Sequence, residues 1–332
     1  MRKVLRAVAI RLLGSRAAVN FRLYRVASHS ALTVLNFHRV DVDNSSAYEA
    51  MAPELFDWLV GWLKEHFRIV VFGDLQNLNP GGKPPLVLSF DDGYRDFVSN
   101  VMPVLAHHGV KANLNVIPGC VESGRPPMNV IIQDFIGQAP ALLLREISFP
   151  GVPERVDPND RVRYGQQVSS AFKCRPLAEQ RLHFARLEHQ FARLNEFRTT
   201  PMMTLDEVRL AAQVHEIGAH SFDHATMTAE TDEFLCADLV RRRAWFHEHI
   251  GVPPAIYAFP NGAARSTHLE LVRQSGFRHA LLVGERFSSV AGFAQPRFTM
   301  YGSGRSEVRF RALGGITPPH PFGIDIGEDT HD

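Results

Sequence analysis

Two adjacent carboxylates at the end of an apolar run are the clearest chemical signal in this chain. The run 86–90 is followed directly by Asp91, Asp92 and Gly93. Successive side chains of a strand point to opposite faces, but a glycine after the pair lets the chain turn, so both carboxylates can reach one pocket. Like charges held that close raise one pKa, which favours one carboxylate on a cation and the other moving protons. The alternative is an ordinary turn, because Asp and Gly are typical turn residues.

A pair of histidines adds a second part to this site. The run 214–219 predicts a strand, His220 follows it, and His224 comes four residues later. Two histidines and one carboxylate, with positions left for water, are typical of a catalytic Zn²⁺ or similar divalent ion. Asp92 would supply the carboxylate. Because the chain has 16 histidines, the alternative is two surface histidines at a strand end and a helix start.

Three motifs together resemble a known enzyme family. They are Ser-Phe-Asp-Asp-Gly-Tyr at 89–94, His-Ser-Phe-Asp-His at 220–224 and Tyr-Ala-Phe-Pro-Asn-Gly at 257–262. Their order and composition resemble the signatures of the polysaccharide deacetylases, also called carbohydrate esterase family 4. The resemblance covers about residues 31–118 and 202–300, and the segment 34–40 is similar to the opening strand of the poly-N-acetylglucosamine deacetylase branch.

The resemblance implies a metal site and a general base. It assigns Asp92, His220 and His224 to one divalent metal ion and makes Asp91 the general base. Zn²⁺ is the expected ion, and the same ligands also accept Co²⁺, Ni²⁺ or Mn²⁺.

The general acid has two positions in the family. In the branch named above it is a histidine at the position of His38, whereas other members place it near the C-terminus in a Leu-His-like motif. His320 lies among prolines and glycines and is no convincing equivalent of that motif. The expected acid is therefore His38, and the alternative is a histidine satisfied at a strand end.

The third motif departs from the family pattern. Many members have Arg-Pro-Pro-Tyr or Tyr-Pro-Tyr where this chain has Ala-Phe-Pro-Asn at 258–261. The family uses the backbone N–H after that proline in its oxyanion hole, and Asn261 retains such a donor. The arginine that would pair with the base is missing here. Arg297 could replace it from another direction, and the alternative is an exposed structural arginine.

These roles imply a metal-dependent hydrolase that removes N-acetyl groups from an acetamido sugar in a polysaccharide, an oligosaccharide or a lipid-linked glycan. The metal polarises the carbonyl and activates water, Asp91 takes the proton of that water, and protonated His38 gives a proton to the departing amine. Two other classes stay open, namely a different metal-dependent hydrolase such as a phosphoesterase or another amidase, and a non-catalytic carbohydrate-binding relative.

Alternating patterns predict an α/β fold in which strands and helices follow one another. Strands are expected at 31–37, 68–72, 85–90, 111–117, 214–219, 255–259 and 279–283, and helices at 53–66, 97–108, 204–213, 231–250 and 263–275. Seven strands suit a distorted (β/α)7 barrel, which the resemblance also implies. In barrels of this kind the chemistry lies at the C-terminal ends of the strands.

Three parts of the chain are expected. Residues 1–30 form a basic amphipathic helix, residues 31–313 the barrel, and residues 314–332 a mobile tail. The barrel includes a helical insertion at 119–201, which either shapes access to the site or packs on the barrel flank. In its helical stretch, apolar side chains share one face: Phe184, Leu187, Phe191 and Leu194.

Charge and composition limit the partners. With 332 residues and 45% hydrophobic content the chain can bury one large core, and its net charge of +1 argues against a nucleic-acid partner. Three cysteines favour a reducing compartment, so the expected location is the cytoplasm. Residues 2–26 are basic and lack an uninterrupted apolar span. They either lie peripherally on the inner face of the membrane or cover the barrel bottom.

Overall fold

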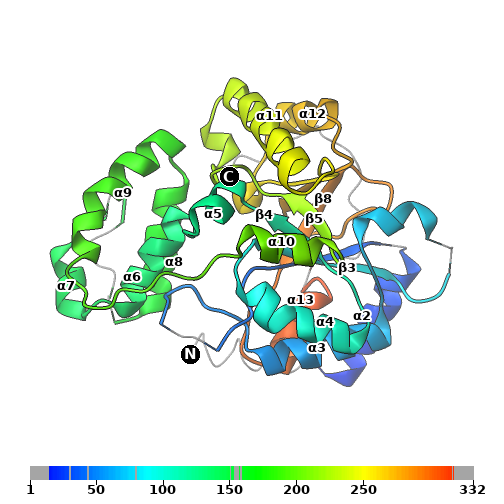
Figure 1. Cartoon of the computed structure of the whole chain (residues 1–332). Coiled ribbons are helices and arrows are strands. Elements are labelled where there is room, and N and C mark those ends of the chain that lie inside the picture. The colour runs from blue at the N-terminus through cyan, green and yellow to red at the C-terminus, as the bar shows by residue number, and fades with distance from the viewer. Residues whose placement is uncertain are drawn as a thin grey trace.

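Parallel strands form a closed ring with helices around it (Figure 1). This computed structural model describes residues 15–29, 31–42, 45–78, 81–149, 151–152, 157, 159–315 and 317. The strands are β1 (Thr33–Phe37), β2 (Arg68–Val70), β3 (Pro85–Asp92), β4 (Asn113–Val116), β5 (Glu216–Ala219), β6 (Ile256–Ala258), β7 (His279–Val283) and β8 (Ala294–Thr299). Because β1 pairs with both β8 and β3, the ring β1-β3-β4-β5-β6-β7-β8 closes into a seven-stranded barrel. The predicted (β/α)7 fold is therefore confirmed.

The barrel strands differ from the prediction in two ways: one predicted strand lies outside the barrel, and one barrel strand was not predicted. β1 takes one edge of β3 at 86–90, and the other edge is shared by β2 at 85–87 and by β4 at 89–92. The predicted strand 68–72 is therefore a short addition beside the ring. The seventh barrel strand is β8, which sequence reasoning missed because Gln295, Pro296 and Arg297 interrupt its apolar pattern. Pro296 is tolerated there because the ladder to β1 begins only at Phe298.

The helices largely follow the predicted positions. Those that cover the barrel are α2 (Arg16–Ser28), α3 (Pro53–His66), α4 (Met102–His108), α10 (Leu205–Ala212), α11 (Asp232–His249), α12 (Ser266–Gln274) and α13 (Arg305–Ala312). Short helical turns are η1 (Phe72–Asn77), η2 (Phe97–Val101), η3 (Met227–Ala229) and η4 (Pro260–Gly262). Pro53 opens α3 at a position where its missing N–H costs nothing, and Thr204 with Glu207 forms a capping box on α10.

Aromatic side chains fill the space between the barrel and the helices. Phe90 of β3 stacks on Phe37 of β1, with ring centroids 5.0 Å apart, and meets Phe56 of α3 and Phe97 edge-on. At the start of β5, Glu216 accepts hydrogen bonds from the N–H groups of Phe72 and Gly73, which fixes η1 against the barrel. The barrel interior is thus filled by packed side chains, and residues that do chemistry are expected at the ends of the strands.

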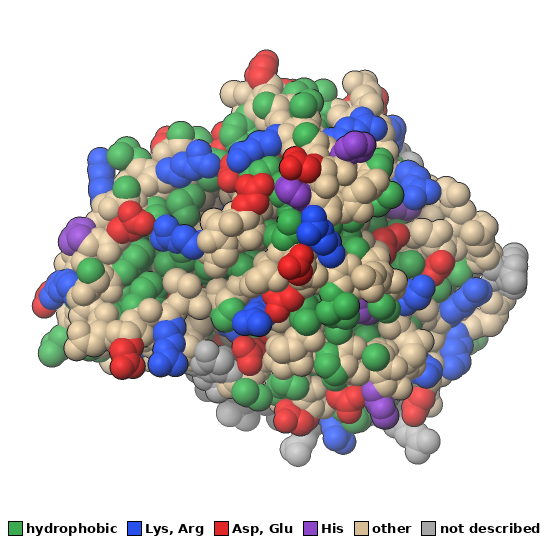
Figure 2. Space-filling view, in the orientation of Figure 1, with side chains coloured by type: hydrophobic (Ala, Val, Ile, Leu, Met, Phe, Trp, Pro, Cys, Tyr) green, Lys and Arg blue, Asp and Glu red, His purple; other side chains and the backbone are tan. Residues whose placement is uncertain are grey.

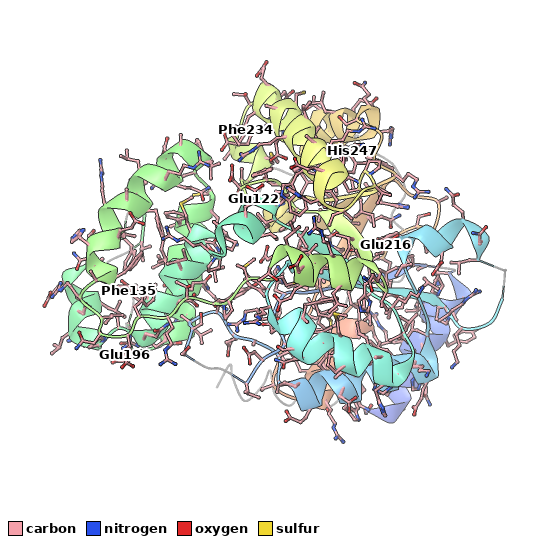
Figure 3. All side chains as sticks on the ribbon, viewed as in Figure 1. Glu122, Phe135, Glu196, Glu216, Phe234 and His247 are labelled. Carbon is pink, nitrogen blue, oxygen red and sulfur yellow. The ribbon has the colours of Figure 1, made fainter. Side chains whose placement is uncertain are left out.

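The predicted insertion forms a helical lobe beside the barrel (Figure 1). Its helices are α5 (Pro118–Ser123), α6 (Met128–Gln138), α7 (Ala141–Glu146), α8 (Arg161–Lys173) and α9 (Leu177–Phe191). α6 to α9 enclose an apolar core of their own, and Phe135 of α6 lies within the lobe in Figure 3. Phe184, Leu187 and Phe191 are buried in that core, so the shared apolar face predicted for this stretch is confirmed.

The described part of the N-terminal helix covers the barrel. Val19 and Val26 of α2 are buried in the main core, and Arg22 donates hydrogen bonds to the carbonyls of Leu313 and Thr317, at 2.9 and 2.7 Å. Residues 1–14 and 30 of the predicted helix lie outside the described residues, as do 316 and 318–332 of the predicted tail. Among the described helices, none has both the length and the apolar character needed to cross a membrane.

Candidate active site

The two carboxylates of β3 reach one site because the chain turns at the second of them. Asp92 has a positive φ of 75° and Gly93 one of 81°. The turn therefore begins one residue earlier than the glycine suggested, at a residue for which this conformation is uncommon. Asp91 and Asp92 are both buried, and they pair in register with Asn115 and Val116 of β4.

Asp92 lies against the two predicted histidines. Its Oδ1 is 3.2 Å from Nε2 of His220 and 3.5 Å from Nε2 of His224, and the three side chains offer ligand atoms within 4.8 Å of one another. His220 immediately follows β5. The hydroxyl of Tyr94 donates to Oδ2 of Asp92 at 2.7 Å, which leaves Oδ1 directed at the imidazoles.

The hydrogen bonding of this group fits a cation. Nδ1 of His220 lies 2.9 Å from the carbonyl of Ala258, which can only accept, so a neutral His220 carries its proton there and turns the Nε2 lone pair toward Asp92. Oδ1 of Asp92 is buried and has no hydrogen-bond partner among the described residues. Lone pairs facing an orphaned carboxylate oxygen are the arrangement that a bound divalent ion would satisfy.

The pKa shifts of Asp92 and His224 fit a ligand set of this kind, whereas the shift of His220 favours its protonated form while Asp92 faces it. Burial lowers the pKa of His224 to about 3, so its imidazole is neutral at physiological pH. Burial on its own would raise the pKa of Asp92, but His220 and His224 beside it hold that pKa below its usual range. Burial lowers the pKa of His220, yet the carboxylates of Asp91 and Asp92 outweigh it and the net shift is upward.

Asp91 is held by a buried arginine. Arg297 of β8 binds it with two hydrogen bonds, Nη1 to Oδ1 at 2.8 Å and Nη2 to Oδ2 at 2.7 Å. Asn115 of β4 also donates to Oδ1, at 2.8 Å. Burial would raise the pKa of Asp91, but Arg297 and His220 hold it below its usual range. The expected rise of one pKa in the pair is therefore wrong, because each carboxylate has its own positively charged or imidazole neighbours.

Arg297 itself differs from its sequence alternative, an exposed structural arginine. It lies within β8 and is fully buried. The structure thus brings Arg297 of β8 to Asp91, the expected base with which the sequence predicted that it could pair.

His38 lies at the same end of the barrel, directly after β1. Burial lowers its pKa, while the charges of Asp92 and Asp91 oppose that shift. The ring of Tyr48 meets His38 edge-on with centroids 6.0 Å apart and meets Tyr94 at 6.2 Å. Ring contacts through Tyr48 and Tyr94 therefore connect His38 to the tyrosine that donates to Asp92.

Asn261 lies in η4, after β6. It has a positive φ of 60°, and its side-chain amide donates to the hydroxyl of Thr226. The side-chain amide is thus engaged by Thr226, and the backbone N–H is the donor that remains for the expected role. His320, which the sequence analysis set aside as a candidate acid, lies outside the described residues.

The loop that carries the histidines is held in an uncommon conformation. Ser221 and His224 have positive φ values of 55° and 59°. Asp238 of α11 accepts hydrogen bonds from the hydroxyl of Ser221 at 3.1 Å and from the N–H of Phe222 at 2.7 Å. Arg242, fully buried one turn later, donates to the other oxygen of Asp238 at 2.7 Å. This buried pair fixes the loop between the two imidazoles.

Sequence reasoning assigned no role to several of these residues. Tyr94 was part of a quoted motif, and Asn115 stands in the alternating pattern Asn-Leu-Asn-Val of a buried strand, which was the available signal. Gly218 makes room for Asn115, since an added Cβ would lie 2.1 Å from its Oδ1. Asp238 and Arg242 gave no signal, because an i, i+4 ion pair on a helix is usually a surface feature.

Comparisons with known proteins agree with this geometry. Residues 198–280 match the family model for polysaccharide deacetylase. No protein with a curated description matches the chain by sequence.

Solved structures share the fold along most of the chain. A deacetylase from Streptococcus pyogenes, PplD, in complex with acetate, has a TM-score of 0.57 at 16% identity, over 85% of this chain and 98% of that one. IcaB from Ammonifex degensii has a TM-score of 0.54 at 16% identity, over 86% and 97%. A de-N-acetylase from Aggregatibacter actinomycetemcomitans has a TM-score of 0.50 at 16% identity, over 80% and 93%. These likenesses show the fold, and together with the family match they confirm that this chain resembles the polysaccharide deacetylases.

Proposed function

We propose that this protein is a metal-dependent hydrolase that removes N-acetyl groups from an acetamido sugar of a glycan. The observation that carries the proposal is the buried group of Asp92, His220 and His224 beside Asp91, which Arg297 holds with two hydrogen bonds. The family match supports deacetylation, and a deacetylase of similar fold holds acetate.

Asp92, His220 and His224 would bind one divalent ion, with Zn²⁺ expected and Co²⁺, Ni²⁺ or Mn²⁺ as alternatives. When bound, such an ion supplies a Lewis acid and lowers the pKa of water toward neutrality. The N-acetyl carbonyl is a poor electrophile, so a Lewis acid and a more acidic water would overcome the main obstacle to its hydrolysis. Tyr94 orients Asp92 for the ion by occupying its second oxygen.

Asp91 acts as the general base. Arg297 keeps it ionised and fixes both of its oxygens, so it is ready to accept a proton from water without rearranging. Asn115 fixes the same carboxylate from the other side. A base that is already positioned avoids the entropic cost of finding its geometry during the reaction.

His38 acts as the general acid, and Asn261 as an oxyanion donor. Burial lowers the pKa of His38, but the charges of Asp92 and Asp91 oppose that shift and favour the protonated form that can give a proton to the departing amine. The left-handed backbone at Asn261 is the kind of fixed geometry that aims an N–H at a developing negative charge.

The sharpest test separates metal binding from proton transfer. Asp91→Asn should keep its metal content but lose acetate release by at least ~100-fold, because it removes only the base. His220→Ala should lose both metal and activity. His247→Ala, an exposed histidine on α11, is the matched control and should keep both. Metal content is read by elemental analysis and acetate by an enzyme-coupled assay on N-acetylglucosamine oligomers and lipid-linked acetamido sugars. Equal loss of metal in Asp91→Asn and His220→Ala would overturn the division of roles.

A further inference from the structure

The segment between β1 and α3 is seated on the helical lobe. The N–H of Ala47 donates to the carbonyl of Gln133 in α6 at 3.0 Å, and the side chain of Ala47 is buried in the apolar core of the lobe. Two glycines allow this close approach. A Cβ added at Gly137 of α6 would collide with the carbonyl oxygen of Ser45, and one added at Gly165 of α8 would lie 2.6 Å from Cβ of Ala47. The segment therefore fits the lobe only because both positions lack a side chain.

The lobe also reaches the start of this segment through buried hydrogen bonds. Asp134 of α6 accepts from the N–H and from the hydroxyl of Thr200, at 2.7 and 2.9 Å. Nη1 of Arg39 in turn donates to the hydroxyl oxygen of Thr200 at 3.4 Å, and Arg39 directly follows His38. Asp134, Thr200 and Arg39 are all buried. The lobe thus holds the segment at two places, next to the expected acid and at Ala47.

Tyr48 is the side chain that this arrangement brings to the site. Its ring meets the rings of His38 and Tyr94 edge-on, with centroids 6.0 and 6.2 Å apart, and the hydroxyl of Tyr94 donates to Asp92. The ring of Tyr48 also packs against a buried apolar cluster that includes Val130 of α6. It is therefore held beside the expected acid, next to the tyrosine that binds a metal ligand.

The hydroxyl of Tyr48 is available to a ligand. The residue is half-buried, and its N–H donates to the hydroxyl of Ser46 at 3.0 Å, but no described residue forms a hydrogen bond with the Tyr48 hydroxyl. That oxygen is also not among the buried, unpartnered polar atoms of the described residues, so it reaches solvent. A fixed ring with an accessible hydroxyl offers an apolar surface and one oriented polar group, as binding sites for small polar ligands do.

We propose that Tyr48 binds the acetamido sugar whose N-acetyl group is removed, and that the helical lobe positions Tyr48 for this contact. The inference rests on the deacetylase function proposed above and adds a sugar-binding residue to it. The hydroxyl of Tyr48 can donate to or accept from a polar group of the sugar, while the ring packs on its C–H groups. Because the lobe fixes the segment before the sugar arrives, little conformational freedom is lost on binding.

Sugar affinity and metal content together test the role of Tyr48. The tetramer of N-acetylglucosamine is titrated by calorimetry into the metal-loaded full chain of the wild type, Tyr48→Phe and Tyr48→Leu. We expect the dissociation constant to rise about fivefold in Tyr48→Phe, which loses only the hydroxyl, and more than about tenfold in Tyr48→Leu, which also loses the ring. KM should change more than kcat, and metal content should stay at the wild-type level. Tyr24→Phe, at an exposed tyrosine of α2, is the matched control and should bind like the wild type.

A compensating pair of substitutions tests the lobe. Gly165→Ala places a methyl group 2.6 Å from Cβ of Ala47, so the segment must shift and the sugar should bind more weakly. The double variant Gly165→Ala with Ala47→Gly removes this clash, and its affinity should return to within about twofold of that of Ala47→Gly alone. Gly304→Ala adds a methyl group at a position with nothing within 4 Å and should leave the affinity unchanged.

Each outcome has a defined meaning. Wild-type affinity in both Tyr48 variants overturns the binding role, as does a wild type that does not bind the tetramer. Loss of metal in Tyr48→Phe also overturns it, because Tyr48 would then act through Tyr94 on Asp92. Weaker binding in the Tyr48 variants with wild-type affinity in Gly165→Ala overturns the positioning by the lobe. If the affinities change as expected but no acetate is released, the sugar contact stands and the deacetylase function fails.

Discussion

At the scale of single residues, the site depends on giving two neighbouring carboxylates different surroundings. Asp92 faces two imidazoles and the hydroxyl of Tyr94, whereas Asp91 faces a guanidinium and an amide. Both pKa values are held low, so the two groups differ in what they touch and not in their charge. A carboxylate that borders the ligands but binds an arginine is suited to proton transfer.

Replacing Arg297 should show, in the pH dependence of activity, how far the pKa of Asp91 depends on the guanidinium. In Arg297→Met, burial is no longer opposed by the guanidinium, so the pKa of Asp91 should rise. Because the base must be ionised, the acidic limb of kcat/KM should move to higher pH, and activity at neutral pH should fall on the order of 100-fold. Activity from pH 4 to 9 measures the shift, and Arg297→Lys, which keeps the charge, should lie in between. An acidic limb at the wild-type pH would show that Arg297 does not act on the base.

At the scale of elements, the loop after β5 is held by α11, a helix that itself contains none of the expected metal ligands. Asp238 of α11 accepts from Ser221 and Phe222, and Arg242 holds Asp238 in place with a hydrogen bond to its other oxygen. Positive φ values in such a loop cost free energy and persist only when the surroundings hold them. α11 therefore contributes to the geometry of the imidazoles.

Asp238→Ala should accordingly weaken metal binding. The substitution orphans the N–H of Phe222 and releases the loop, so we expect metal affinity to fall about tenfold to 100-fold, as for other groups that orient ligands. Competition with a coloured chelator measures the affinity. Asp206→Ala, an exposed aspartate on α10, is the matched control and should bind metal normally. A variant that unfolds at lower temperature but keeps wild-type metal affinity would limit Asp238 to a structural role.

At the scale of the whole molecule, the barrel is enclosed by two additions. α2 buries Val19 and Val26 in the main core, and the lobe docks on the histidine loop while it keeps an apolar core of its own. On the face shown in Figure 2, acidic and basic side chains are interspersed, in keeping with the small net charge. Peripheral membrane contact through residues 2–26 and a cytoplasmic location stay predictions.

The packing of α2 implies that the helix stabilises the barrel whatever else it does. A chain that begins at residue 30 loses two fully packed valines and the hydrogen bonds of Arg22, so we expect its unfolding free energy to fall on the order of 3 kcal/mol. Chemical denaturation monitored by circular dichroism gives this value. Phe21→Ser, which alters an exposed side chain of the same helix, should leave it unchanged. Equal midpoints for the shortened and full chains would mean that α2 adds no stability.

The sequence by itself determined the residues at the ends of β1, β3, β5 and β6 and the helices between them. Local signals suffice for this, because apolar runs, a proline at a helix start and glycine turns act over a few residues. The sequence also predicted that Asp92, His220 and His224 lie together, since the C-terminal ends of parallel strands meet at one end of a barrel.

Only the tertiary structure decided how the ring closes and what holds the base. β8 is a barrel strand because it pairs with β1 on one side and β7 on the other, although Pro296 interrupts the apolar pattern of its sequence. Arg297 meets Asp91 because the closing of that ring brings together residues 206 positions apart in the sequence. Contacts of this range depend on packing between elements, which no local pattern of residues encodes.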